Sequence, residues 1–243
     1  GEKVVLVAAY SNEVPAMEYA LTKMMAEGKL PKMEYKSLYY QWGSSITAIL
    51  EEISNADYVI TLSEMNEIGD LSPDSLSTYV PKLIENYTKE KQIKSVLVSV
   101  SKPYDLANFS SSPALMAVYG VNGMNAEDAD GTVSPKSTYG PNIPAAVEVA
   151  FGVSAPWGTL PVDIPTITDT GEMDTNTLAY PIGHGLTYAG YTDPYTEPAT
   201  QADTSQEATN INKEIANEKK LTLTELVKTN RLWIVLGAVV LIV

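Results

Sequence analysis

The stretch Val4-Val-Leu-Val-Ala-Ala9 determines the fold class. A continuous apolar run of this length, rich in valine, predicts a β-strand that is buried on both faces. Ser11 and Asn12 follow it, and their side-chain oxygens are typical caps for the start of a helix. Across residues 15–28 the apolar side chains then recur at helical spacing. The chain therefore opens with a strand that leads into a helix.

The same alternation recurs downstream. The expected elements are helices over 46–53 (capped by Ser44 or Ser45), 73–87 and 143–151, and strands over 58–62, 95–100 and 115–119. Because the crossover between parallel strands lays a helix on a face of the sheet, this order predicts an α/β fold: a three-layer sandwich with a mostly parallel sheet covered by helices on both faces. Ligands of such sheets bind beyond the carboxyl ends of the strands, which here means the loops 10–13, 63–70 and 101–109.

Composition narrows the chemistry. The chain has 243 residues, which suits one main core, and a formal charge of −14, which would repel a phosphate backbone. Nucleic acid is therefore not an expected partner. The chain has no cysteine and a single histidine, His184, so thiol chemistry and multi-histidine metal sites are excluded. No cofactor and no metal are expected, and carboxylates, hydroxyls and tyrosines are left to carry any reaction.

The C-terminal part has a different character from the rest. Residues 1–190 form the expected globular domain, and residues 191–222 are a polar, acidic stretch typical of a linker. Residues 223–243 end in the uncharged run 232–243 behind Lys228 and Arg231. We expect a truncated membrane anchor there, with a buried C-terminal helix as the alternative, because a full span needs about 20 apolar residues. This reading places the protein at the cell surface, with the domain outside. No signal-peptide pattern precedes the first strand, so the natural start is expected to be missing or processed.

Three segments resemble family 3 glycoside hydrolases, in the same order as in that family. Lys94-Ser-Val-Leu-Val-Ser-Val-Ser-Lys-Pro-Tyr-Asp-Leu-Ala-Asn-Phe-Ser-Ser-Ser-Pro-Ala-Leu-Met-Ala-Val-Tyr-Gly120 is similar to a strand, a "PYDL" loop and the next strand of its β-N-acetylglucosaminidase branch. Pro144-Ala-Ala-Val-Glu-Val-Ala-Phe-Gly-Val-Ser-Ala-Pro-Trp-Gly-Thr-Leu-Pro-Val162 resembles the family's helix, turn and closing strand. Tyr180-Pro-Ile-Gly-His-Gly-Leu-Thr-Tyr188 is similar to the "FPFGYGLSY" signature of many of its β-glucosidases, with His184 where an aromatic residue is usual.

The resemblance implies that residues 1–190 are the C-terminal, flavodoxin-like sandwich domain of this family. The family's nucleophile is an aspartate on a (β/α)8 barrel, which alone takes about 250 residues and does not fit in this chain. The chain is therefore expected to be inactive alone and to complete the cleft of a barrel on the same precursor or on another chain. The substrate implied is a β-linked N-acetylglucosamine or glucose. The alternative is a non-catalytic, membrane-tethered module for glycan binding or scaffolding.

The resemblance also suggests site residues. In the β-glucosidase branch the acid/base glutamate comes from the sandwich domain, and Glu64 and Glu67 follow a strand at a comparable place, with Asp70 nearby. A solvated or capping role is the alternative for both glutamates, since the other branch takes its acid/base histidine from the barrel and the "PYDL" motif favours that branch.

Other side chains are candidates for substrate binding. Tyr104 and Asp105 follow a strand at the expected crevice, with turn stabilisation as the alternative. His184 stands between two glycines and is a further candidate for substrate binding, with an exposed loop imidazole in place of an aromatic ring as the alternative. Trp42 and Trp157 offer rings for sugar stacking or for packing. A nucleotide-binding flavodoxin-like protein is a third possibility, but no glycine-rich phosphate loop follows the first strand.

Overall fold

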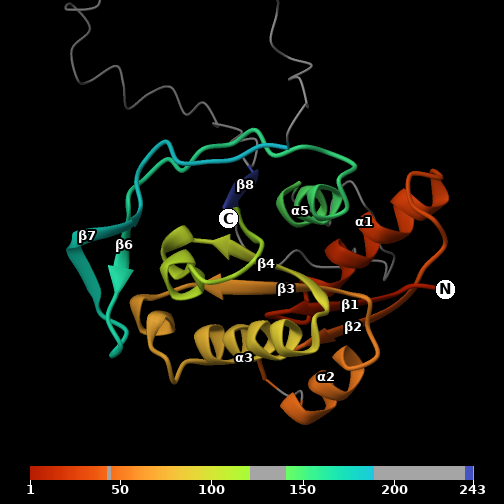
Figure 1. The fold of residues 1–243 in the computed structure, drawn as a ribbon, viewed down its shortest axis with the longest axis horizontal. Helices are drawn as coiled ribbons and strands as arrows, with labels where there is room; N and C mark the ends of the chain where they lie inside the picture. Colours follow the sequence, from red (N-terminus) through yellow and green to blue (C-terminus); the bar gives the residue numbers. More distant parts are fainter. Residues whose placement is uncertain (43–44, 121–140, 189–238, 243) are drawn as a thin grey trace, which may run out of the picture. The chain divides into compact units, whose positions relative to one another are not determined.

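A computed structural model describes residues 1–42, 45–120 and 141–188, and the backbone of residues 239–242. Its main feature is a six-stranded sheet, drawn in Figure 1. The strands lie in the order β2 (Glu34–Tyr39), β1 (Lys3–Ala8), β3 (Tyr58–Met65), β4 (Lys94–Ser101), β5 (Leu115–Val118) and β8 (Val239–Ile242). The first five strands of this order are parallel, and β8 is antiparallel to β5.

Helices cover both faces of the sheet, as Figure 1 shows. On one face α1 (Val14–Ala26) and α5 (Asn142–Ala150) bury residues such as Leu6, Leu62 and Val100. On the other face α2 (Ile46–Ile53) and α3 (Leu76–Lys91) bury Val5, Val7 and Val59. The predicted three-layer α/β sandwich with a mostly parallel sheet is confirmed.

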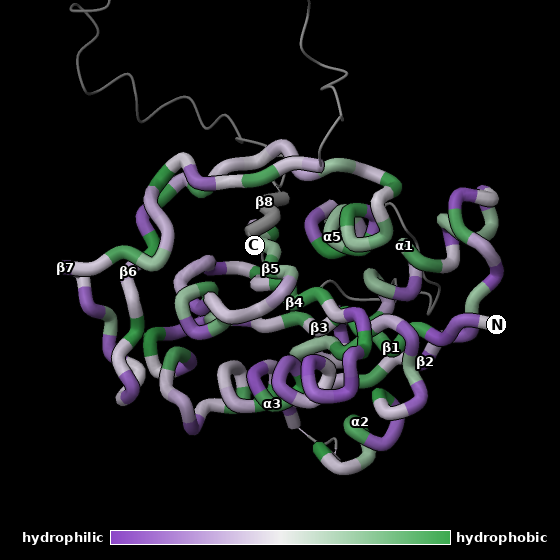
Figure 2. Tube along the Cα trace, viewed as in Figure 1, coloured by the Kyte–Doolittle hydropathy of each residue, from purple (hydrophilic) through white to green (hydrophobic). Residues whose placement is uncertain are grey.

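Hydropathy explains why β1 lies inside the sheet, between β2 and β3. All residues from Val4 to Ala9 are fully buried, because successive side chains point alternately into the two helical layers. Figure 2 shows apolar residues along the central strands and long hydrophilic stretches along α3. Buried apolar surface stabilises a fold by about 25 cal/mol per Å². The side chains of β1 therefore help to hold the helices on both faces of the sheet.

The helix caps differ in part from the expected ones. Ser45 caps α2, since its Oγ accepts a hydrogen bond from the Ala48 amide at 3.4 Å, and this agrees with one of the two predicted caps. The prediction that Ser11 or Asn12 caps α1 is wrong. Glu13 holds that position, and its Oε2 accepts from the Tyr10 amide at 2.8 Å.

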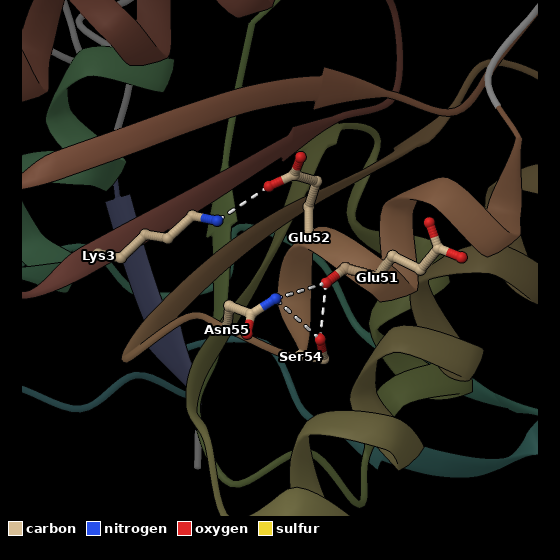
Figure 3. A network of polar contacts seen from close by, with 5 residues as sticks. All are labelled: Lys3, Glu51, Glu52, Ser54 and Asn55. Atoms are coloured by element: carbon tan, nitrogen blue, oxygen red, sulfur yellow. Dashed lines mark hydrogen bonds and ion pairs between the residues drawn. The ribbon is translucent and has the colours of Figure 1, made fainter.

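The last turn of α2 is closed by side chains without a glycine (Figure 3). Ser54 Oγ donates to the carbonyl of Glu51 at 2.7 Å, and Asn55 Nδ2 donates to the same oxygen at 3.3 Å. Lys3 at the start of β1 pairs with Glu52 at 2.9 Å. The Lys3–Glu52 ion pair joins the end of α2 to the amino-terminal edge of the sheet.

Two further pieces complete the described fold. A two-stranded antiparallel sheet pairs β6 (Ile164–Ile167) with β7 (Met173–Tyr180). Short 3₁₀ helices follow β3 and β4, namely η1 (Ile68–Leu71) and η2 (Pro103–Phe109), and η2 contains the Pro-Tyr-Asp-Leu motif. Both η helices therefore lie at the carboxyl edge of the main sheet.

Residues 192–236, which include most of the predicted linker, lie outside the described residues. Residues 239–242 were expected within an apolar helix, but they form strand β8 because their backbone pairs with β5. Across residues 1–42, 45–120, 141–188 and 239–242, no helix has the length and apolar content needed to cross a membrane.

Candidate functional site

The site follows from the order of the strands. β1 lies between β2 and β3; the chain leaves β1 toward the face covered by α1 and leaves β3 toward the face covered by α3. Loops that turn to opposite faces open a crevice between the carboxyl ends of two neighbouring strands, which is where open α/β sheets bind ligands. The loops 10–13 and 66–70 meet at this point.

Two buried carboxyl groups lie below the crevice. Glu64, in β3, is fully buried, and Glu13, at the start of α1, is 1% exposed. Burial raises the pKa of Glu13 to about 8, and the charge of Glu64 and a hydrogen bond between the two side chains add to this rise. The Tyr10 amide, which donates to Glu13, opposes it. The two buried carboxyl groups therefore resist ionising together, and the pKa of Glu13 lies above that of an ordinary glutamate.

An open groove of about 460 Å³ lies at the same edge of the sheet. Its walls come from the ends of β1, β2 and β3 and from the start of α3. The lining residues are Tyr10, Gln41, Trp42, Asn66, Glu67, Asp70, Ser75 and Leu76. We call this the switch-point groove. It combines two aromatic rings with two carboxyl groups and two amides, a mixture that matches a hydroxyl-rich ligand with apolar faces.

Trp42 is the most exposed large apolar side chain of the described residues, at 83%. Its φ of 60° lies in the left-handed region, which costs a bulky residue on the order of 1 to 3 kcal/mol. The neighbouring Gln41 holds it there, since the Gln41 amide donates to the Ala9 carbonyl at 2.9 Å and its Nε2 donates to Ser77 Oγ at 3.0 Å. The exposed position of the Trp42 indole ring therefore comes with a conformational cost in the backbone.

Glu67 and Asp70 shape the opposite wall. Asp70 Oδ2 accepts from the amides of Asn66 and Glu67, at 2.8 and 3.0 Å. Asn66 Nδ2 lies 3.4 Å from the Tyr10 hydroxyl. The Glu67 side chain is exposed and lines the groove, whereas Glu64 is enclosed below it. The acid/base roles proposed for the two glutamates stay predictions, but only Glu67 has direct access to a groove-bound molecule.

Asp105 belongs to a separate buried cluster. Its Oδ1 accepts from Ser99 Oγ, and its Oδ2 lies 2.7 Å from Ser63 Oγ. Burial raises the pKa of Asp105 to about 7, although the hydrogen bonds from Ser99 and Ser63 lower it in part. The cluster ties η2 to β3 and β4, which supports the turn-stabilising interpretation of this residue; its role in substrate binding stays a prediction.

The other predicted binding residues do not line the switch-point groove. Tyr104 packs half-buried against the apolar cluster around Phe109 and Leu160. His184 lies in a turn whose backbone pairs with Leu160, and its ring centroid is 5.4 Å from that of Tyr180. No group of three or more histidine, aspartate or glutamate side chains in the described part of the chain is arranged to hold a metal ion.

Sequence reasoning missed Glu13, Asn66 and Gln41. Glu13 and Asn66 do stand in loops expected to form a site, so their position in the order of strands was the available signal. Gln41 and Trp42 follow β2, a strand that the sequence did not predict, so nothing in the pattern placed them at this edge.

Comparisons with known proteins give partial matches. No family model matches the chain. Over 60 residues, 22% of its length, it is 40% identical to the probable beta-glucosidase C of Aspergillus flavus and to that of Aspergillus oryzae, and it spans about a tenth of either relative (10% and 9%). A solved beta-glucosidase from Listeria innocua in complex with glucose aligns with 77% of the chain at 14% identity and a TM-score of 0.46, over 30% of its own length. The sequence match relates a 60-residue part of the chain to the two beta-glucosidases.

Proposed function

We propose that this chain is the C-terminal sandwich domain of a family 3 glycoside hydrolase and that its switch-point groove forms part of a carbohydrate site. The nucleophile would come from a (β/α)8 barrel on the same precursor or on another chain. The substrate would be a β-linked glucose or N-acetylglucosamine. The local identity to beta-glucosidase C supports the reaction class.

The observation that carries this proposal is the exposed ring of Trp42, which lies beside two carboxyl groups and whose backbone has a strained, left-handed φ. Sugars present flat C–H faces and hydroxyl edges. An indole ring binds the face by burying apolar area, and carboxylates and amides bind the edges through hydrogen bonds. Strain retained at an exposed aromatic residue indicates function, because packing gains nothing from it.

Within this proposal Glu67 is the residue placed to serve as the general acid. Its side chain lines the groove and Asp70 fixes its backbone, so the carboxyl group starts from a defined position. A glycosidic oxygen over the Trp42 ring would then lie between this carboxyl and the barrel that supplies the nucleophile. Two carboxyl groups on opposite sides of the bond are what retaining hydrolysis requires.

A non-catalytic glycan-binding module is the second candidate. The observation in its favour is that the groove is built from this chain's own strand ends and does not need another domain for its walls. The two candidates make the same prediction for sugar binding and different predictions for hydrolysis. The cell-surface location and the membrane tether are proposals that rest on the amino-acid sequence alone.

Sugar binding is tested by titrating the full chain with methyl β-glucoside and methyl N-acetyl-β-glucosaminide and following the heat of binding by calorimetry. We expect millimolar binding that weakens at least about tenfold in Trp42→Ala, since the stacked ring supplies the main apolar contact. The matched control is Trp157→Ala, which removes a 40% exposed tryptophan outside the groove. Unchanged affinity in Trp42→Ala would overturn the assignment of the groove.

Hydrolysis separates the two candidates. The full chain is assayed with chromogenic β-glucoside and β-N-acetylglucosaminide, alone and together with a barrel-containing partner from its source. Turnover only in the mixture, reduced at least about a hundredfold by Glu67→Gln, supports the hydrolase domain. Sugar binding with no turnover in either sample supports the binding module. Turnover by the chain alone contradicts the premise that the nucleophile lies elsewhere.

A further inference from the structure

A second polar centre lies away from the switch-point groove, between α3 and the sheet. Three buried side-chain oxygens there make no hydrogen bond to any residue that the structure describes: Thr61 Oγ1, Glu85 Oε2 and Ser112 Oγ. They come from three parts of the fold, β3, α3 and the turn after η2. An unpaired buried polar atom costs about 1 to 3 kcal/mol, so three at one place require a physical explanation.

All three side chains line the same void, which measures about 10 Å³. That is close to the smallest space that holds one water molecule, for which about 10 to 15 Å³ is needed. The other walls are mainly apolar and come from Pro81, Ile84, Leu97 and Pro113. The void is therefore too small for an organic ligand. Thr88 and Ser95 also line it, but the Thr88 hydroxyl donates to Ser95 Oγ at 3.0 Å, so these two side chains already have a partner.

We propose that this void is a binding site for a single structural water molecule, held by Thr61, Glu85 and Ser112. Buried waters typically make about three hydrogen bonds, which is the number of unpaired oxygens here. The water donates to the Glu85 carboxylate, whose other oxygen, Oε1, accepts from Ser111 Oγ at 3.3 Å. The hydroxyl groups of Thr61 and Ser112 each donate or accept as the geometry requires, because both can do either.

A metal cation fits this site less well. Hard cations take about six or more oxygen ligands, and the unpaired oxygens number half of that. A water molecule needs no ligands beyond the three oxygens present. Its role is mechanical: it connects the middle of α3 to β3 and to the turn that ends η2, and so supports the segment that carries Asp105.

The test uses the full chain and counts long-lived internal water molecules by oxygen-17 relaxation dispersion. Ser112→Val fills the void with methyl groups, and we expect it to hold one fewer such water than the unmodified chain. The matched control is Ser111→Ala, which removes a hydrogen bond to the same carboxylate without lining the void and keeps the count unchanged. Equal counts in Ser112→Val and the unmodified chain would overturn the proposal.

A milder variant covers the case in which Ser112→Val does not fold. Thr61→Val keeps the shape of the side chain and removes one of the three partners, so the water should exchange about tenfold faster. An unaltered exchange time would contradict the assignment. Melting temperatures in sodium chloride and choline chloride at equal ionic strength should agree, and a melting temperature several degrees higher in sodium would assign the site to a cation in place of water.

Discussion

Ser63 Oγ lies 2.7 Å from Asp105 Oδ2 and 3.1 Å from the carbonyl oxygen of Ser77. Pro81 has no N–H to donate to that carbonyl, so α3 leaves it without its helical partner. A serine hydroxyl has one proton for these two acceptors. Ser63 donates to Asp105 when that carboxyl is ionised. When Asp105 is protonated, its own proton can bridge to Ser63 Oγ, which leaves the Ser63 proton for the carbonyl of Ser77.

The first prediction concerns Asp105. Its folded-state pKa of about 7 lies above the ordinary value of 3.8. The protonated carboxyl therefore stabilises the fold fully below about pH 4, and this contribution, on the order of a few kcal/mol, is lost as the pH rises through about 7.

We expect the free energy of unfolding of Asp105→Asn to depend less on pH over this range, since an amide replaces the protonated acid. Urea unfolding at pH 5, 7 and 8 measures it, with the exposed Asp74→Asn as control. Parallel pH profiles for Asp105→Asn and the unmodified chain would rule out a protonated Asp105.

The second prediction concerns Glu13. Its pKa is raised to about 8 from 4.5, so the sign is the same: stability is highest below about pH 4.5 and falls as the pH rises through about 8. Glu13→Gln should remove the part of the fall that extends above pH 7, because its amide oxygen still accepts from the Tyr10 amide. Unfolding between pH 6 and 9 tests this against Glu34→Gln, which alters an exposed glutamate on β2. A Glu13→Gln profile that still falls between pH 7 and 9 contradicts it.

The third prediction concerns the backbone at Trp42. Glycine adopts a φ of 60° without the penalty that a Cβ brings, so Trp42→Gly should be more stable than Trp42→Ala by about 1 kcal/mol. In a chain of this size that difference raises the melting temperature by about 2 to 4 °C. Calorimetry of the two variants measures it. If alanine proves as stable as glycine, the left-handed conformation does not persist in solution.

The fourth prediction compares two glycines with similar positive φ. Gly171 has φ +88°, and a Cβ there would lie 2.6 Å from the Cα of Ser72, whereas Gly183 has φ +80° and no atom within 4 Å. Gly183→Ala should cost about 1 kcal/mol for the conformation alone. Gly171→Ala adds a backbone clash and should cost about 2 to 4 kcal/mol. Equal melting temperatures for the two variants would mean that the turn at Gly171 does not pack against Ser72.

The strands that the sequence predicted are those buried on both faces. β1, β3 and β4 have apolar runs that are typical of buried strands. β2 was missed because it is an edge strand whose first residues, Glu34 to Lys36, are exposed, so its pattern resembles a loop. β7 was missed for the same reason, since most of its residues are exposed or half-buried. β6 overlaps the closing strand that the family resemblance implied, which continued into Asp163-Ile164-Pro165.

The sequence predicted where the site lies in the fold, but only some of the residues that form it. The rule for parallel sheets pointed to the loops after β1, β3 and β4, and the first two of these line the groove or lie below it. The pairing of Glu13 with Glu64 depends on how α1 starts, which local sequence does not reveal. Trp42 was a candidate for sugar stacking, but placing it in this groove required the position of β2, a strand that the sequence did not predict.

The pairing of β8 with β5 also has a consequence during synthesis. Val118 and Val239 are neighbours in the sheet, yet almost half the chain separates them, so the ribosome releases β5 long before its outer partner exists. Until then β5 has an open edge that other nascent chains can pair with. Yield in the cell should therefore depend on chaperones that shield this edge, even if the finished domain is stable.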